Sequence, residues 1–194
     1  VVTNNEQWAQ RAQSFRNHCL STDHRERHDS GDWFYAVEDM GMNYRLTDLQ
    51  CALGTSQLPK VPGWTARRQA IAGQYDSAFA TVSAVTPLAQ SADSINAYHL
   101  YVIQLELDQL SVDRNQVFKA LRAENIGVNL HYIPVHLHAM YQQQLGTEAG
   151  QCPQAEAAYN RIISLPIFPA MTDHDTADVI MAVERVCQHY ASAS

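Results

Sequence analysis

Apolar side chains recur every three to four residues in six stretches of the chain. Such spacing places them on one face of an amphipathic helix. Asp113 and Thr172 are suited to cap the starts of two of these helices, and Pro62 stands in the first turn of another. The predicted helices cover residues 5–16, 47–58, 62–79, 113–125, 155–162 and 172–190.

The run 98–105 is apolar at most positions and on both faces of an extended chain, which is typical of a central strand. Residues 126–133 form a second predicted strand that ends at Pro134, and residues 81–96 form a connection with at most a short strand. The mixed-charge run 23–29 has no apolar period, so it predicts a solvated loop. This order of elements predicts an α+β fold, with helices over one face of a mainly antiparallel sheet.

Residues 41–50 place polar side chains directly ahead of a predicted helix. Thr47 and Gln50 fit a capping box, in which each side chain bonds the backbone amide of the other. The triplet 43–45 stands just before this helix start, where backbone amides and the helix dipole attract anions. The stretch is therefore a candidate anion-binding loop, although an ordinary loop before a capped helix explains the same residues equally well.

Length, charge and cysteine usage limit the kinds of protein that this chain can be. Its 194 residues suffice for one domain, or for one domain with part of another. A formal net charge of −7 argues against a nucleic-acid partner, which normally meets a basic face, but a small phosphorylated ligand needs only a few local donors. Four scattered cysteines suit unpaired thiols in a reducing cytoplasm. No apolar run approaches the roughly 18 residues that span a membrane, so we expect no membrane partner.

Three histidines, His131, His136 and His138, lie within one stretch of eight residues. Imidazoles this close could share a zinc ion. Pro134 bends the chain between them, however, and no carboxylate or cysteine stands nearby in sequence as a fourth ligand. A polar ligand-binding loop at a strand end and hydrogen-bonded packing are the other two interpretations, and we expect no metal site.

The stretch 41–58, with Asn43-Tyr44-Arg45-Leu46-Thr47-Asp48 and Ala52-Leu53-Gly54, closely resembles the signature of the DegT/DnrJ/EryC1/StrS family. These are pyridoxal-phosphate-dependent aminotransferases that act on nucleotide-linked keto sugars. Within the family, the stretch is most similar to enzymes of pseudaminic-acid and related amino-sugar pathways. The resemblance covers nearly the whole chain, because further matching segments lie on both sides of this stretch in family order. They are residues 1–4, 16–18, 98–102, 127–137 and 165–169.

The resemblance implies the fold type I aminotransferase architecture, in which a large cofactor-binding domain precedes a small C-terminal α+β domain. Residues 1–60 would be the C-terminal remnant of the large domain, 61–80 a connecting helix and 81–194 the small domain. The chain opens without a methionine, so we expect it to be a piece of a longer protein. The family's cofactor lysine, the aspartate that faces the pyridine nitrogen and the Gly-Thr phosphate turn would lie upstream of Val1.

The resemblance also implies roles for four residues. In the family, the asparagine of the Asn-Tyr-Arg loop contacts the cofactor phosphate of the neighbouring subunit. The resemblance therefore assigns this contact to Asn43 and implies a homodimer. The arginine lies near the nucleotide sugar, which assigns a substrate contact to Arg45, whose planar fork suits a diphosphate or a carboxylate. A His-Tyr pair that ends a small-domain strand reaches the sugar, which assigns substrate binding to His131 and Tyr132.

Two lysines are present, Lys60 and Lys119. Lys60 lies between helix-breaking prolines and Lys119 on the polar side of a predicted helix, so neither has the desolvated setting that lysine catalysis needs. The resemblance therefore implies the C-terminal part of an aminotransferase that moves an amino group from glutamate, through pyridoxal phosphate, to a nucleotide-linked keto sugar. Alone it would be inactive and would not bind the cofactor. The alternative is a truncated, non-catalytic binding or interaction module derived from this family.

Overall fold

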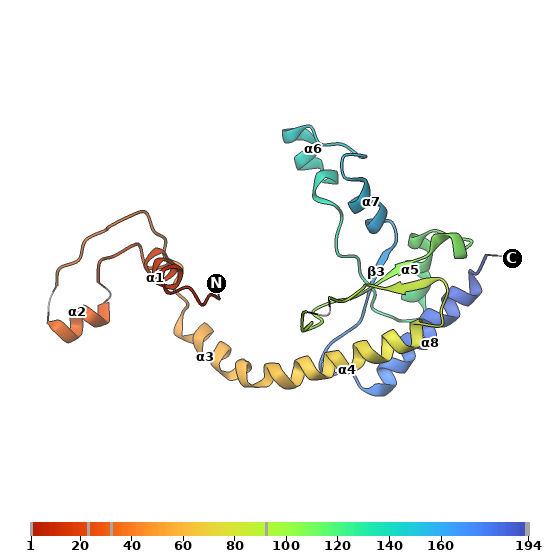
Figure 1. Ribbon diagram of the computed structural model, residues 1–194, viewed down its shortest axis with the longest axis horizontal. Coiled ribbons are helices and arrows are strands. Elements are labelled where there is room, and N and C mark those ends of the chain that lie inside the picture. Colours follow the sequence, from red (N-terminus) through yellow and green to blue (C-terminus); the bar gives the residue numbers. More distant parts are fainter. Residues whose placement is uncertain (1, 23, 32, 92, 193–194) are drawn as a thin grey trace. The chain divides into compact units, whose positions relative to one another are not determined.

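The chain forms two compact units, residues 1–59 and 60–194 (Figure 1). None of its described helices is long and apolar enough to cross a membrane. The computed structural model describes residues 2–22, 24–31, 33–91 and 93–192.

The described part of the first unit contains the helices α1 (Glu6–Phe15), α2 (His24–Ser30) and α3 (Asp48–Gln57). α1 begins after Asn5, whose side chain accepts a hydrogen bond from the Trp8 amide at 3.1 Å. α3 begins after Thr47, whose hydroxyl accepts from the Gln50 amide at 3.3 Å. The Gln50 side chain accepts in return from the Thr47 amide at 2.9 Å. The predicted capping box is therefore confirmed.

The loop predicted for residues 23–29 is wrong, because His24–Ser30 is the helix α2; Asp23 lies outside the described residues. Arg27 Nη1 donates to the carbonyl of Thr22 at 2.7 Å. The same guanidinium lies 4.8 Å from the centre of the Tyr35 ring. Arg27 thus links this polar helix to neighbouring segments through a hydrogen bond and a ring contact, which a search for apolar periodicity does not detect.

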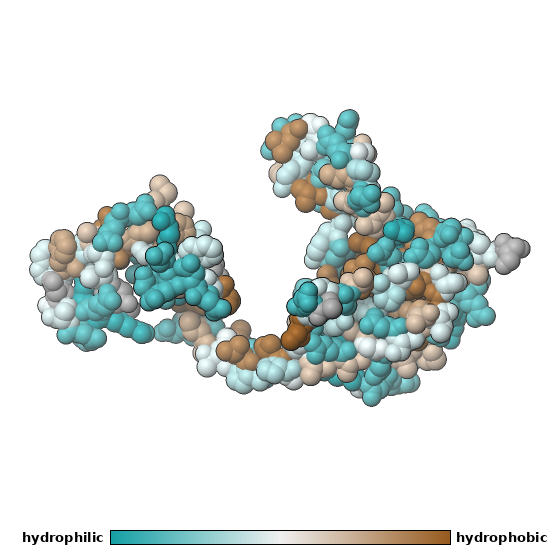
Figure 2. Space-filling model, in the orientation of Figure 1, coloured by the Kyte–Doolittle hydropathy of each residue, from teal (hydrophilic) through white to brown (hydrophobic). Residues whose placement is uncertain are grey.

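The first unit has little core of its own. Cys19 is the one buried side chain among its described residues. Isolated antiparallel bridges join Asn17 to Asn43 and Leu20 to Val37. Figure 2 shows hydrophobic residues at the surface where α3 leads into the helix α4 (Val61–Phe79). The exposed leucines of α3 and its C-terminal end are Leu49, Leu53 and Leu58.

The second unit contains a sheet of three antiparallel strands in the order β1-β2-β3. β2 is the central strand, as its apolar pattern predicts. Residues of β2 are alternately buried and half-buried, so one face of the sheet points into the core. Val102 and its partner Ser164 lie on the opposite face. The strands are β1 (Val85–Pro87), β2 (Tyr101–Leu105) and β3 (Ile162–Leu165).

The helices α4, α5 (Arg114–Ala123) and α8 (Asp173–His189) pack with one face of this sheet (Figure 1). Their fully buried side chains join those of the strands in one core, which includes Ile71, Tyr75, Phe79, Ile103, Leu105, Val117, Leu121, Ile163 and Val183. The predicted α+β fold, with helices over one face of an antiparallel sheet, is confirmed. The remaining helical elements are η1 (Leu58–Lys60), η2 (Leu107–Gln109), η3 (Val135–Leu137), α6 (Ala139–Leu145) and α7 (Pro153–Tyr159).

The strand predicted for residues 126–133 is wrong. Only Asn129 pairs with β3, exchanging two backbone hydrogen bonds with Ser164 at 3.1 and 2.8 Å. The next amide, that of Leu130, donates to the side chain of Asn129 at 2.8 Å. Such a local bond competes with the strand ladder and ends it after a single pair. The helix predicted for 155–162 also ends early, because Ile162 begins β3.

Candidate functional site

Residues 41–45, which we call the donor loop, run antiparallel to the end of α1. The amide of Met42 donates to the carbonyl of Phe15 at 2.7 Å. The amide of Tyr44 donates to the carbonyl of Arg16 at 2.9 Å. These backbone bonds fix the register of the loop against the segment that follows α1.

Gly41 allows this approach because it has no side chain. A Cβ atom at this position would lie 2.5 Å from the backbone nitrogen of Cys19 and 2.6 Å from the carbonyl carbon of His18. Both contacts are with backbone, which cannot rotate away as a side chain can. The glycine that begins the family signature is therefore a requirement of close backbone packing.

The donor loop brings Asn43 and Arg45 together, as the sequence signature requires. Arg45 Nε donates to Oδ1 of Asn43 at 3.1 Å. Arg45 Nη1 donates to Oδ1 of Asn17 at 2.9 Å. Asn17 thus supports Arg45 with its side chain and Asn43 with its backbone bridge. This role was not predicted, because Asn17 lies 28 residues before Arg45, although it falls within the matching segment 16–18.

The cluster formed by Asn17, Asn43 and Arg45 keeps donors available for a ligand. The side-chain amide nitrogens of Asn17 and Asn43 donate to no residue that the structure describes. The same holds for Nη2 of Arg45. Asn43 and Arg45 are exposed. Amide and guanidinium N–H groups are the donors that phosphate oxygens accept, and a guanidinium adds a permanent positive charge. The donor set therefore fits a phosphate group, such as that of pyridoxal phosphate.

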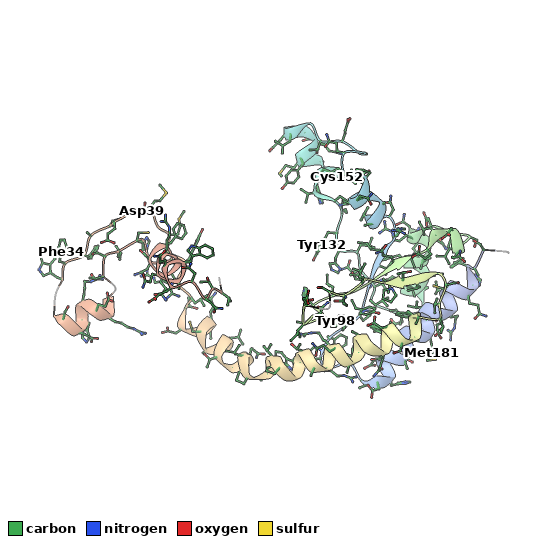
Figure 3. All side chains as sticks on the ribbon, in the orientation of Figure 1. Phe34, Asp39, Tyr98, Tyr132, Cys152 and Met181 are labelled. Atoms are coloured by element: carbon green, nitrogen blue, oxygen red, sulfur yellow. The ribbon has the colours of Figure 1, made fainter. Side chains whose placement is uncertain are left out.

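His131 and Tyr132 lie together on the segment between the sheet and η3. The two rings meet edge to face, with centroids 4.6 Å apart. His131 Nδ1 lies 2.8 Å from Oγ of Ser164, a partner that sequence analysis missed. Tyr132, labelled in Figure 3, is 72% exposed. The pair can therefore offer an imidazole nitrogen and a phenol to a ligand.

His136 serves packing. It is buried, and its Nε2 lies 2.8 Å from Oε1 of Glu156. The same oxygen accepts from the Gly150 amide at 2.8 Å. Hydrogen bonds from His136 first, and then from Gly150, hold the pKa of the Glu156 carboxyl below its usual value.

His131 and His136 thus have different hydrogen-bond partners, Ser164 and Glu156. In the described ranges, no group of three His, Cys, Asp or Glu side chains is arranged to hold a metal ion.

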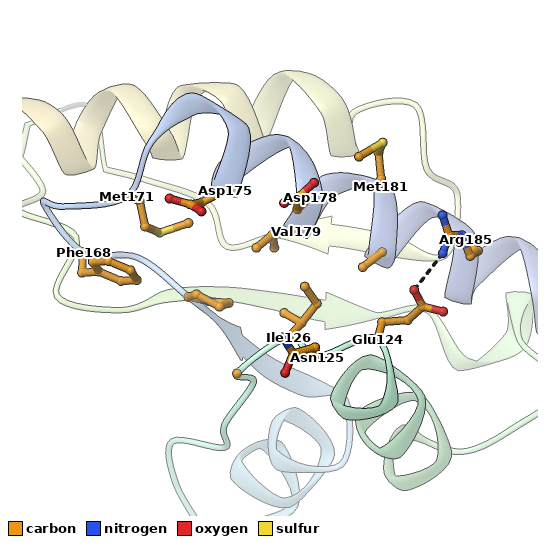
Figure 4. Close-up of a pocket in the computed structure, with 13 residues that line it drawn as sticks. Glu124, Asn125, Ile126, Phe168, Met171, Asp175, Asp178, Val179, Met181 and Arg185 are labelled. Atoms are coloured by element: carbon orange, nitrogen blue, oxygen red, sulfur yellow. Dashed lines mark hydrogen bonds and ion pairs between the residues drawn. The ribbon is translucent and has the colours of Figure 1, made fainter.

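A pocket of about 440 Å³ opens elsewhere in the second unit, beside α8 (Figure 4). Its polar rim has structural partners: Arg185 Nη1 donates to Oε2 of Glu124 at 2.8 Å. Hydrogen bonds from Thr172 lower the pKa of Asp175, which completes the cap of α8. None of the four predicted site residues lines this pocket.

The predicted site residues divide between the two units. Asn43 and Arg45 belong to the first unit, and His131 and Tyr132 belong to the second. Within each pair the two side chains are in contact. Asn17 anchors the first pair through Arg45, and Ser164 anchors the second through His131.

Comparisons with known proteins agree with the sequence signature. The spore coat polysaccharide biosynthesis protein SpsC of Bacillus subtilis is 38% identical over 189 residues, which cover 96% of this chain and 48% of SpsC. Helicobacter pylori PseC, an aminotransferase of pseudaminic acid biosynthesis, superimposes with a TM-score of 0.80 at 26% identity over 97% of this chain and 48% of PseC. The pyridoxal-phosphate form of the sugar aminotransferase Spr1654 of Streptococcus pneumoniae gives 0.79 at 26% identity, over 98% and 46% of the two chains.

The chain therefore spans about half the length of the relatives that it matches. Its fold corresponds to the matched half of the fold type I aminotransferases. The sequence model of the DegT/DnrJ/EryC1/StrS aminotransferase family matches residues 1–184. This chain belongs to the DegT/DnrJ/EryC1/StrS aminotransferase family.

Proposed function

We propose that this chain is the C-terminal part of an aminotransferase that transfers an amino group from glutamate to a nucleotide-linked keto sugar with pyridoxal phosphate. The observation that carries the proposal is the donor cluster of Asn17, Asn43 and Arg45, of which Asn43 and Arg45 are exposed and lie within the family signature. The relatives named for polysaccharide and pseudaminic acid biosynthesis support a sugar as the substrate.

In this proposal the donor loop serves a phosphate. Asn43 donates its free amide N–H groups to the phosphate of the cofactor in the neighbouring subunit of a homodimer. Arg45, held in place by Asn17, offers Nη2 to the diphosphate or carboxylate of a substrate. The cofactor supplies an electron sink for the amino transfer, and the protein supplies binding and orientation.

His131 and Tyr132 bind the sugar in the same proposal. The exposed phenol and the outward edge of the imidazole both form directional hydrogen bonds with hydroxyl or carbonyl oxygens. Directional contacts of this kind select a sugar by the positions of its oxygens, since an unmatched polar group in the site costs binding energy.

The lysine that carries the cofactor would lie outside these 194 residues. Lys60 and Lys119 are both exposed, so neither has the desolvated setting that a nucleophilic lysine needs. Lys60 Nζ lies 6.0 Å from the centre of the Trp64 ring, within cation–π distance. The chain alone would therefore neither hold pyridoxal phosphate covalently nor catalyse transamination.

Exposed leucines support the expectation that further protein surface covers the first unit. Leu49 is 82% exposed and Leu58 is 71% exposed, on a unit whose only buried described side chain is Cys19. Apolar surface left in water in this way is typical of an interface. The cofactor-binding half and the second subunit of the homodimer would supply the missing contacts, in a reducing cytoplasm that keeps the four free cysteines unpaired.

The coding sequence immediately upstream of Val1 tests the proposal against its alternative. A reading frame that continues upstream and encodes a cofactor lysine supports the aminotransferase. A start codon placed directly before Val1 would instead favour a non-catalytic binding module.

In the protein that such a frame encodes, we expect Arg45→Gln to raise the KM for the nucleotide sugar. Loss of a charged hydrogen bond costs about 1.5–3 kcal/mol, or roughly 10- to 150-fold. Arg122→Gln removes the same charge from an exposed position on α5 and is the matched control. Equal KM values for the two variants would contradict the role of Arg45.

A further inference from the structure

Ser164 is a polar residue buried on the face of the sheet that points away from the core. It pairs with Val102 of β2 on one side and with Asn129 on the other. Its exposed fraction is 4%, although the neighbouring Asn129 is exposed. His131 follows Asn129 by two residues, a spacing that returns a side chain to the same face of an extended segment and into diagonal reach of Ser164.

The Ser164 hydroxyl has one hydrogen-bond partner among the residues that the structure describes, His131 Nδ1 at 2.8 Å. A hydroxyl has a single hydrogen to donate, and a buried donor without an acceptor is costly. If His131 Nδ1 carried the proton, the imidazole would donate to Oγ and the hydroxyl hydrogen would have no acceptor. The hydroxyl is satisfied only when it donates to an unprotonated Nδ1.

In neutral histidine, an unprotonated Nδ1 places the proton on Nε2. Nε2 makes no hydrogen bond with any described residue, and the side chain is half-buried. The ring edge that points away from Ser164 is therefore an N–H donor that is free for a ligand. The ring of Tyr132 lies beside the imidazole of His131, in edge-to-face contact with it.

We propose that Ser164 is a positioning residue that holds neutral His131 in the Nε2–H form, so that the ligand group opposite His131 is an acceptor oxygen. This inference rests on the proposed function, because it assumes that His131 meets the substrate. A carbonyl, hydroxyl or phosphate oxygen satisfies the Nε2–H group. A protonated amine does not, since it also has only hydrogens to donate. His131 would thus discriminate between an oxygen and an ammonium group at one position of the sugar.

The test is the tautomer of His131, read by long-range proton–nitrogen NMR on the ¹⁵N-labelled 194-residue chain at a pH where histidine is neutral. The His131→Gln variant assigns the signals. We expect an unprotonated Nδ1 and a protonated Nε2 in the unmodified chain. A protonated Nδ1 would overturn the inference, whatever the behaviour of any variant.

Two variants separate positioning from packing. Ser164→Ala removes the hydroxyl and should move the His131 nitrogen shifts toward those of a mixture of tautomers, whereas Ser164→Thr keeps a hydroxyl and should preserve the Nε2–H form. Unchanged His131 shifts in Ser164→Ala would also overturn the inference. The measurement needs no substrate, so a failure of the proposed function would leave the tautomer unchanged, and the opposite tautomer would leave the roles of Asn43 and Arg45 intact.

Discussion

Substitution of Gly41 by alanine tests whether the donor loop owes its position to close backbone packing. The new Cβ would lie 2.5 Å from the Cys19 nitrogen and 2.8 Å from the His18 Cα. Ordinary contacts of a Cβ are at least 3.4 Å. The backbone of the loop must therefore move away from the segment after α1 by several tenths of an ångström or more.

The cost of this movement follows from the contacts that it breaks. Overpacking of a fixed site costs about 1–3 kcal/mol. The displaced segment would lose the amide bonds of Met42 and Tyr44 and the alignment of Arg45 with Asn17. Local opening of the loop should become roughly 5- to 150-fold more frequent, since each 1.4 kcal/mol changes an equilibrium tenfold.

Amide hydrogen exchange of the whole chain measures this opening. We expect the amides of Met42 and Tyr44 to exchange faster in Gly41→Ala. Gly54→Ala is the matched control, because nothing lies within 4 Å of its Cβ position in the middle of α3. It should stabilise that helix by up to about 1 kcal/mol and leave both amides as they are. Equal exchange of both amides in Gly41→Ala and in the unmodified chain would refute the packing argument.

Three further substitutions test the second unit. Tyr75→Phe leaves the Pro166 carbonyl without the hydroxyl that donates to it at 2.8 Å, and should lower the free energy of unfolding by about 1–2 kcal/mol in urea denaturation; an unchanged midpoint would contradict the bond's role. Gly73→Ala fills open space in α4 and should raise the same free energy by up to about 1 kcal/mol, so a lower midpoint would show a contact that the structure lacks. Folding lowers the pKa of Glu156, so its stabilising contribution is present at neutral pH and is lost as the pH falls below the usual 4.5 and through the folded-state value. In an acid titration the Gly150 amide resonance should follow this loss, and Glu156→Gln should abolish the response; an identical titration in the variant would exclude Glu156 as its source.

Long amphipathic elements were predictable because each one is specified within its own sequence. The strand β2 shows an apolar run and the helix α8 an apolar face, and the caps at Thr47 and Thr172 depend on residues three positions apart. Such local signals do not depend on the rest of the fold.

The missed elements depend on distant partners or on polar contacts. β3 is four residues long and follows a helix, so its pattern merges with that of α7. α6 has no buried residue and therefore no apolar face to detect. The strand predicted beyond Asn129 fails because of a single side-chain bond to the next amide. Competition between local and long-range hydrogen bonds is decided only in the folded chain.

Site residues divide in the same way. Asn43, Arg45, His131 and Tyr132 are recognisable from a family signature, but the contacts of their anchors are not, because each anchor acts across the fold. Asn17 lies 28 residues from Arg45, and Ser164 lies 33 residues from His131. The division of the chain into 1–60, 61–80 and 81–194 also remains a prediction, although the compact units meet at residue 60.

Incubation of the 194-residue chain with pyridoxal phosphate, followed by borohydride reduction and peptide mass spectrometry, tests the central claim most directly. The account predicts no stoichiometric, saturable attachment at Lys60 or Lys119 and no transamination of a keto sugar with glutamate. Saturable attachment of one cofactor per chain at either lysine, accompanied by transamination, would contradict the claim that this chain supplies only part of the site.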